Sequence, residues 1–514
     1  MNAATCWGRA PAIASFLLLA ACAQLPQHPG LPAVSTPPTG INAPLDRAFS
    51  TAEAQHPGES GFRLVIEGME AFVIRMHSAR MAARSLDVQT YIWHADTTGL
   101  YLARQLLEAA DRGVHVRLLV DDLDARARNA GFAAIASHPN VEVRLFNPFA
   151  SRSGGLNLAS EGARDFGRVN RRMHNKSWIA DNRLAVVGGR NLGDEYFAAS
   201  SEVNFVDLDL AMIGPVVRDV SASFDRFWNS SAAWPVELLD PDASSAEALA
   251  RLRARLDELT AGAGESSYAR SLRENDGVQR LVNGDWPLQW SAKYRFVSDD
   301  PAKVTMERRD AARAVVGAAI VPLIRNAAHS LQIISPYFVP GDQGSAALVE
   351  RAKAGADVRV LTNSLAANDV ASVHGGYSRH RKALIEGGVA VFELKPLSSR
   401  SGTSLTGSSG ASLHTKALVA DGQTLFVGSY NLDPRSTWLN TEQGVLVENA
   451  TLAGQLGEIF ALESSGTRAW HVTLEGGSLR WGDGTQTFDG EPQASFSRRF
   501  QAWLARLFHL DAQL

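Results

Sequence analysis

Apolar and polar positions follow two alternating periods along most of this chain. Short apolar runs bounded by glycine or polar residues, at 85–92, 114–120 and 140–146, are typical of buried strands. Between the first two runs, residues 100–110 carry apolar side chains at helical spacing, and Gly113 ends that pattern. Strands that alternate with helices in this way predict an α/β fold.

The same order of elements recurs in the second half. A strand is expected at 331–339, a helix at 345–354, and strands at 358–361 and 388–392. The matching elements lie at a nearly constant offset from those of the first half, which indicates an internal duplication. We therefore expect two lobes related by a pseudo-twofold axis, each a mixed β-sheet flanked by helices.

The length of 514 residues is too great for one small core. We divide the chain into six segments. These are a signal peptide (1–21), an anchor and flexible tether (22–58), a first lobe (59–235), an insert (236–295), a second lobe (296–466) and a C-terminal extension (467–514). An amphipathic helix is expected within the insert, as a covering helix on the lobe surface.

The N-terminus has the pattern of a secretory signal. An apolar run at 12–21 follows Arg9 and is too short to span a bilayer. The two alanines before Cys22 resemble the bacterial lipoprotein box, which implies cleavage before Cys22 and its acylation. The expected location is the cell envelope, facing the periplasm, and Ala23 favours the outer membrane. An ordinary signal peptide with an incidental cysteine is the alternative.

Composition and charge narrow the class of partner. Apolar residues make up 45% of the chain and charged residues 20%, which is usual for a soluble globular protein. The net charge of -4 provides no global basic field, so nucleic acid is not an expected partner.

A short active-site string occurs twice, as His-x-Lys-x4-Asp. The residues are His174, Lys176 and Asp181 in the first copy, and His414, Lys416 and Asp421 in the second. On a strand, positions i and i+2 face the same side, so each His and its Lys should point into one pocket. For the two aspartates, a buried structural hydrogen-bonding role is an alternative to catalysis.

A small-residue turn and an asparagine follow each copy. Asn191, Ser429 and Asn431 are candidate hydrogen-bond donors to a phosphate. Gly189 stands where the second copy has Ser429, so the two halves are not equal.

This chemistry suits phosphoryl transfer through a histidine. One imidazole must be neutral to attack phosphorus, and the other must be protonated to give its proton to the leaving alkoxide. Asp207 and Glu442 are candidates to orient the imidazoles. The lysines supply the positive charge, so we expect neither a metal nor a cofactor.

The duplicated string, extended to His-x-Lys-x4-Asp-x6-Gly-(Gly/Ser)-x-Asn, resembles the phospholipase D superfamily. The flanking runs 171–176, 188–197, 363–370 and 428–436 are similar to bacterial cardiolipin synthases, the C type most closely. The resemblance implies two phospholipase D-like lobes and a phosphatidyltransferase acting through a phosphohistidine. Cardiolipin would form from phosphatidylglycerol and a second phospholipid, either phosphatidylglycerol again or phosphatidylethanolamine. We assign His174 as the nucleophile and His414 as the acid/base, although the near-symmetric sequence leaves the reverse open.

Other functions fit parts of the pattern. A phospholipase D-type hydrolase would use the same residues, and so would a nuclease, which the charge and the anchor disfavour. A non-catalytic lipid-binding envelope lipoprotein is disfavoured by the two intact motifs. The need for an accessory protein is left open. Candidate substrate-side residues, for which local hydrogen bonding is the alternative role, are Tyr91, Tyr337, Asn363, Asp369, His374 and Tyr377.

Overall fold

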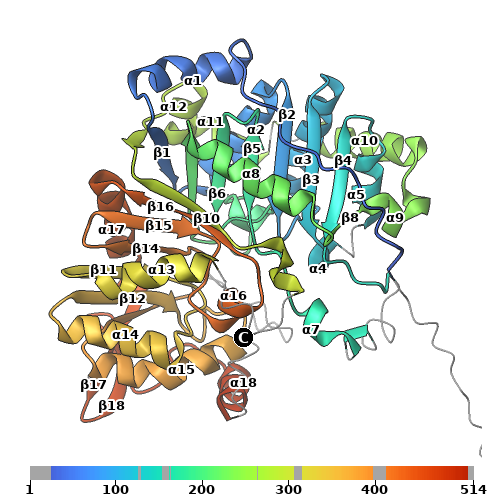
Figure 1. Ribbon diagram of the computed structural model, residues 1–514. Helices are drawn as coiled ribbons and strands as arrows, with labels where there is room; N and C mark the ends of the chain where they lie inside the picture. The colour runs from blue at the N-terminus through green and yellow to red at the C-terminus, as the bar shows by residue number, and fades with distance from the viewer. Residues whose placement is uncertain are drawn as a thin grey trace, which may run out of the picture.

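Two mixed β-sheets, one in each half of the chain, form the framework of the protein (Figure 1). The computed structural model describes residues 25–125, 129–152, 161–162, 164–262, 264, 266–305, 315–396 and 413–507. The first sheet contains β1 (Ser60–Val65), β2 (Ser85–Thr90), β3 (His115–Asp121), β4 (Val141–Phe146), β5 (Ser177–Ala180), β6 (Leu184–Gly188), β7 (Asp209–Ile213), β8 (Ala233–Pro235) and β9 (Gln289–Ser291). The second contains β10 (Tyr294–Ser298), β11 (Ser330–Ile334), β12 (Asp357–Asn363), β13 (Ala390–Leu394), β14 (Ala417–Ala420), β15 (Thr424–Gly428), β16 (Gln443–Glu448), β17 (Ala469–Glu475), β18 (Ser478–Gly482) and β19 (Thr487–Phe488).

The two sheets share one topology. The order β4-β3-β2-β5-β6-β7-β1 in the first sheet corresponds to β13-β12-β11-β14-β15-β16-β10 in the second. In each sheet the first three of these strands are parallel, and the fourth pairs antiparallel to the third. Every residue of β2 is buried, as expected for a strand covered on both faces. The predicted α/β fold with two duplicated lobes is confirmed.

Helices cover the sheets. The first half has α2 (Gly68–Met81), α3 (Thr97–Asp111), α4 (Asp122–Ala125), α5 (Asn129–Ala136), α7 (Phe166–Val169), η2 (Asp194–Tyr196), α8 (Val216–Trp228), α9 (Val236–Leu239), η3 (Pro241–Ala243), α10 (Ala246–Thr260), α11 (Ser267–Glu274) and α12 (Asp276–Val282). The second half has η5 (Pro301–Val304), α13 (Val315–Asn326), α14 (Gly341–Lys353), α15 (Ala371–Glu386), α16 (Pro434–Trp438), α17 (Ala450–Glu463) and α18 (Phe496–Leu507). Helix α3 begins earlier than predicted because the Asp96 side chain accepts a hydrogen bond from the backbone N–H of Gly99 and caps the helix.

A shared hydrophobic core joins the lobes. Val187 of β6 and Leu210 of β7 belong to the same buried cluster as Val427 of β15 and Val445 of β16. These are equivalent strands of the duplicated sheets, so the lobes pack through equivalent faces. Burial of this apolar surface fixes their relative position.

The segment expected as a flexible tether, 22–58, is partly built into the fold. Helix α1 covers Pro44–Gln55, with the proline in its first turn. Before it, Thr36 Oγ1 donates to Asp87 Oδ2 (3.0 Å) and accepts from Arg117 Nη2 (2.7 Å). Composition alone predicted an extended linker, but these specific contacts fix the chain from Thr36 onward. Cys22 lies outside the described residues.

The expected insert and C-terminal extension both add strands. Strand β9 pairs with β1 at the edge of the first sheet, and β17 pairs with β13 in the second. Helix α10 packs against the core of the first lobe through Leu249, Leu252 and Leu256, as a covering helix. Within the part of the chain described above, no helix has the length and apolar character needed to cross a membrane.

Candidate active site

The two motifs stand at equivalent places in the two sheets. His174 and Lys176 directly precede β5, and His414 and Lys416 directly precede β14. All four side chains are largely buried; the lysines are 3% and 1% exposed. The duplicated strings therefore enter one interior site from opposite lobes.

Each histidine is held by a carboxylate of the other lobe. His174 Nδ1 lies 2.9 Å from Glu442 Oε2, and His414 Nδ1 lies 2.6 Å from Asp207 Oδ2. Because Nδ1 is engaged with a carboxylate, Nε2 is the ring nitrogen left to face a reacting phosphorus. The predicted orienting role of Asp207 and Glu442 agrees with this geometry. The sequence did not predict that each contact joins a histidine of one lobe to a carboxylate of the other.

Backbone hydrogen bonds across the lobe boundary produce this exchange. The N–H of His174 donates to the carbonyl of Thr441 (2.9 Å), the residue before Glu442. The N–H of His414 donates to the carbonyl of Val206 (2.8 Å), the residue before Asp207. The contacts are reciprocal, as a pseudo-twofold axis requires.

The lysines place positive charge beside both imidazoles. Lys176 Nζ donates to the carbonyl of His174 (2.7 Å), and Lys416 Nζ donates to that of His414. Burial lowers the pKa of Lys176 to about 7 and that of Lys416 to about 8. An anionic phosphate in the site would favour the charged form of both lysines.

The two His–carboxylate pairs differ in charge. Burial raises the pKa of Glu442 to about 7, whereas the charge and hydrogen bond of His414, with the charge of Lys416, outweigh burial and hold the pKa of Asp207 below its usual value. Burial and the nearby lysines lower the pKa of both histidines, that of His174 the further; for His414 the Asp207 carboxylate opposes the shift. Of the two, His174 is therefore the better suited to be the neutral imidazole, and His414 keeps a proton more readily than His174 does.

The difference between Gly189 and Ser429 follows from these carboxylates. A Cβ atom at position 189 would lie 2.2 Å from Asp207 Oδ1, so only glycine fits there. In the second half, Ser429 Oγ donates to Glu442. Ser429 was predicted to bind phosphate, but its hydroxyl proton is committed to the carboxylate that orients His174.

The motif aspartates lie at the far ends of β5 and β14. The Asp181 carboxylate accepts hydrogen bonds from the backbone N–H groups of Ala83, Arg84 and Ser85 (2.7–3.1 Å). Asp421 makes the same contacts with residues 328–330. Both residues have positive φ, 53° in each case, in the turn that leaves the strand. For Asp181 and Asp421, this geometry supports the structural role that the sequence left open as the alternative to catalysis.

The two motif asparagines differ. Asn191 Nδ2 donates to the hydroxyl of Tyr196 (2.9 Å), and its Oδ1 accepts from the N–H of Ile92 (3.3 Å). Asn431 is also buried, but its Oδ1 has no hydrogen-bond partner within the described ranges. The Oδ1 atom of Asn431 can therefore accept a hydrogen bond from a ligand hydroxyl, which differs from the predicted donation to a phosphate.

Aromatic rings pack against both imidazoles. Tyr91 contacts His174 edge-on, with ring centroids 5.1 Å apart, which supports its predicted place on the substrate side. Tyr196 and Phe205 contact His414 at 5.3 and 5.4 Å. Sequence reasoning missed both rings, although Tyr196 lies in the run that follows Asn191.

The remaining predicted residues divide into two groups. Asn363 Nδ2 donates to the carbonyl of Leu413 (3.1 Å) and so holds the residue before His414. Tyr337 donates its hydroxyl to Asp369 (2.7 Å). In contrast, the Tyr377 hydroxyl donates to Glu393 (2.9 Å), and Tyr377 and His374 form part of a buried network centred on Glu393, Arg381 and Glu491. For those two residues the local structural alternative holds.

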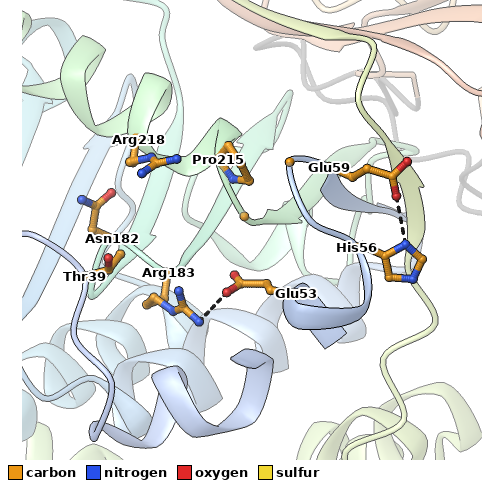
Figure 2. Close-up of a pocket in the computed structure, with 10 residues that line it drawn as sticks. Thr39, Glu53, His56, Glu59, Asn182, Arg183, Pro215 and Arg218 are labelled. Carbon is orange, nitrogen blue, oxygen red and sulfur yellow. Dashed lines mark hydrogen bonds and ion pairs between the residues drawn. The ribbon is translucent and has the colours of Figure 1, made fainter. Parts of the chain in front are cut away.

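A separate cavity of about 250 Å³ lies on the first lobe (Figure 2). It is lined by Asn182 and Arg183, in the turn after β5, and therefore stands at the opposite end of this strand from Lys176. Its charged groups pair locally: Arg183 with Glu53 at 2.7 Å, and His56 with Glu59 at 2.9 Å. The cavity has no part in the histidine site.

Comparisons with known proteins agree with this geometry. A family model described as "Cardiolipin synthase, PLD-like domain" matches residues 74–228 and 320–462, and so contains both motifs. Cardiolipin synthase C of Escherichia coli is 41% identical over 473 residues, covering 89% of this chain and 97% of the relative. Cardiolipin synthase A of Pseudomonas syringae is 27% identical, covering 80% of this chain and 72% of the relative.

A solved structure shares the fold. The crystal structure of a phosphatidylserine synthase from Haemophilus influenzae aligns with a TM-score of 0.55 at 14% identity, covering 91% of this chain and 98% of that one. The family model covers more than half of the chain and both halves of the site. The chain thus belongs to the cardiolipin synthase family of phospholipase D-type phosphatidyltransferases, as its duplicated motif predicted.

Proposed function

We propose that this protein makes cardiolipin by transferring a phosphatidyl group to the glycerol hydroxyl of phosphatidylglycerol, with His174 as the nucleophile. The observation that carries the proposal is the pair of crossed His–carboxylate contacts, whose carboxylates differ: the pKa of Glu442 is raised and that of Asp207 is lowered, so an imidazolium is better stabilised at His414 than at His174. The name of the Escherichia coli relative supports the choice of product.

In the first step, Nε2 of neutral His174 attacks the phosphorus of the donor lipid. A P–N bond forms while the P–O bond to the head group breaks, and His414 gives its proton to the departing alkoxide. The Asp207 carboxylate stabilises the imidazolium until that transfer. Lys176 and Lys416 neutralise the non-bridging phosphate oxygens.

In the second step, His414 acts as a base. It takes the proton of the incoming hydroxyl, whose oxygen attacks phosphorus and displaces His174. With phosphatidylglycerol as the donor, the released head group is glycerol; with phosphatidylethanolamine, it is ethanolamine. Water as the acceptor would give phosphatidic acid, which is the hydrolase alternative.

The test is product analysis on labelled lipid. Purified protein should convert labelled phosphatidylglycerol, with or without phosphatidylethanolamine, to cardiolipin; phosphatidic acid as the sole product would establish the hydrolase instead. His174→Ala and His414→Ala should each abolish turnover. His115→Ala, at a histidine paired with Glu142 away from the site, is the matched control and should retain full activity.

The roles of the two histidines can be separated with an activated donor. A phosphodiester with a nitrophenyl leaving group needs no proton from an acid, so His414→Ala should still accumulate phosphohistidine. His174→Ala should accumulate none. A phosphohistidine found only in His174→Ala would reverse the assignment.

We further propose that the mature protein is held to the envelope by acylated Cys22, with the outer membrane favoured. The support is the apolar run at 12–21 with two alanines before the cysteine. Mass spectrometry should find a lipid-modified N-terminal Cys22, and Cys22→Ser should release the protein from sedimented membranes. An unmodified cysteine, or unchanged membrane retention of Cys22→Ser, would contradict the anchor.

A further inference from the structure

Helix α18 turns its large apolar side chains away from the protein. The exposed fraction is 85% for Phe496, 51% for Phe500 and 54% for Trp503, and Leu504 is also exposed. At helical spacing these residues form one stripe. A helix that merely covered a lobe would bury such a stripe, so this orientation needs another explanation.

The opposite face of α18 attaches the helix to the lobe. Ala502 and Ala505 are its buried residues, and they pack against α15 (Figure 1). At Gly375 of α15, an added Cβ would lie 2.5 Å from the carbonyl oxygen of Ala502, so the helices are in close contact. Small residues allow this approach, and the apolar stripe is held outward by a rigid support.

The same helix carries only positive charge. Arg498, Arg499 and Arg506 lie within Phe496–Leu507, which contains no acidic residue. Arg499 and Arg506 are exposed. The Arg499 guanidinium donates to the backbone carbonyls of Ala494 and Glu491, so these contacts do not neutralise its charge. Arginine beside an exposed aromatic stripe is complementary to an anionic lipid surface.

Helix α18 is connected to the histidine site through one loop. Arg498 Nη1 donates to the carbonyls of Leu365 and Asn368, in the loop that ends at Asp369. Asp369 accepts the hydroxyl of Tyr337, and its charge acts on Lys416 of the motif. A cavity of about 650 Å³ lies between Asp369 and the α18 residue Leu504. A surface that met α18 would therefore lie against the rim of the active site.

We propose that α18 is a membrane-docking helix, which lies in the interface of an anionic bilayer and presents the rim of the site to lipid. Phe496, Phe500 and Trp503 enter the boundary between head groups and acyl chains, and the arginines meet phosphates. This surface is distinct from the Cys22 anchor and requires no turnover. An acyl anchor at Cys22 limits only the distance of the protein from the bilayer, whereas docking through α18 also fixes the orientation of the active site relative to the bilayer.

The first experiment locates the helix relative to lipid. The full chain with Cys6→Ser and Cys22→Ser has no remaining cysteine, so Trp503→Cys can be labelled with an environment-sensitive fluorophore. On phosphatidylglycerol vesicles that contain shallow spin-labelled lipid, quenching at position 503 should exceed that at the control Leu259→Cys by about threefold or more. Leu259 is an exposed apolar residue of α10 and matches Trp503 in exposure. Equal quenching at the two positions would overturn the proposal.

The second experiment measures function. Phe500→Ser combined with Trp503→Ser should lower the rate on phosphatidylglycerol vesicles about tenfold or more, and leave the rate on a dispersed short-chain lipid within about twofold. Leu259→Ser should change neither rate. An equal loss on both substrates, or a stripe that forms a dimer of this chain in place of lipid contact, would refute docking. If no cardiolipin is made, the quenching result still decides the role of α18 independently.

Discussion

Asp207→Asn should separate proton donation from the rest of the reaction. The substitution keeps shape but removes the negative charge 2.6 Å from His414 Nδ1. With charge centres about 4 Å apart and an effective dielectric of about 20, that charge stabilises the imidazolium by about 4 kcal/mol. Each 1.4 kcal/mol, roughly, is tenfold in rate, so kcat/KM on a phospholipid should fall about 1,000-fold.

The assay compares two leaving groups. A nitrophenyl phosphodiester releases nitrophenolate, which departs without protonation. On this substrate, the loss of rate in the first step should shrink to about tenfold or less. Asp87→Asn removes another buried carboxylate, paired with Arg117 away from the site, and controls for lost stability. A loss of the same size on both substrates would refute the acid role of His414 and the reasoning from its carboxylate.

Three further outcomes are expected. Lys176→Arg should make the alkaline fall of kcat/KM between about pH 7 and pH 8 shallower, because Lys176, whose pKa is about 7, loses its charge across that range whereas arginine keeps it, and the titration of His414 and Lys416 remains; an unchanged pH profile contradicts this. Asp181→Asn should lower the free energy of unfolding by about 2 kcal/mol in denaturant titration but keep kcat/KM within about threefold, since its carboxylate accepts hydrogen bonds from backbone N–H groups and pairs with Arg84, at the end of β5 away from the histidines; a large loss of activity at full stability would restore a catalytic role. Gly189→Ser should lower kcat/KM about 100-fold by displacing Asp207. A variant whose kcat/KM equals that of the wild type would disprove this prediction.

Features that depend on the spacing of residues along the chain could be predicted from the sequence. The His-x-Lys pairs, the strands around them and the repeated element order follow from periods of two and 3.6 residues. The pairing of Glu442 with His174 depends on how the lobes pack, and no local pattern carries that information. This pairing depends on the backbone hydrogen bond from His174 to Thr441, the residue before Glu442.

The errors also have physical causes. Proline-rich composition predicted a tether, but the Thr36 hydroxyl finds partners in the buried Asp87–Arg117 pair. Within the C-terminal extension, periodicity can show that α18 has an apolar stripe but not whether protein or solvent faces it. For Asp181, the spacing repeated in the two motifs could not distinguish a turn-forming carboxylate from a reacting one.

The crossed carboxylates have a consequence for whether one lobe can hold a site alone and for how the two halves can become different. Neither lobe holds a complete His–carboxylate pair, so a single lobe expressed alone would have an unsupported imidazole. A symmetric dimer of one ancestral lobe would be complete, but with two identical pairs. Fusion of the duplicated gene removes that identity and lets one half adopt Asp207 with Gly189 while the other keeps Glu442 with Ser429. Because both lobes are encoded in one chain, each histidine can have its own carboxylate, which a dimer of identical lobes could not provide.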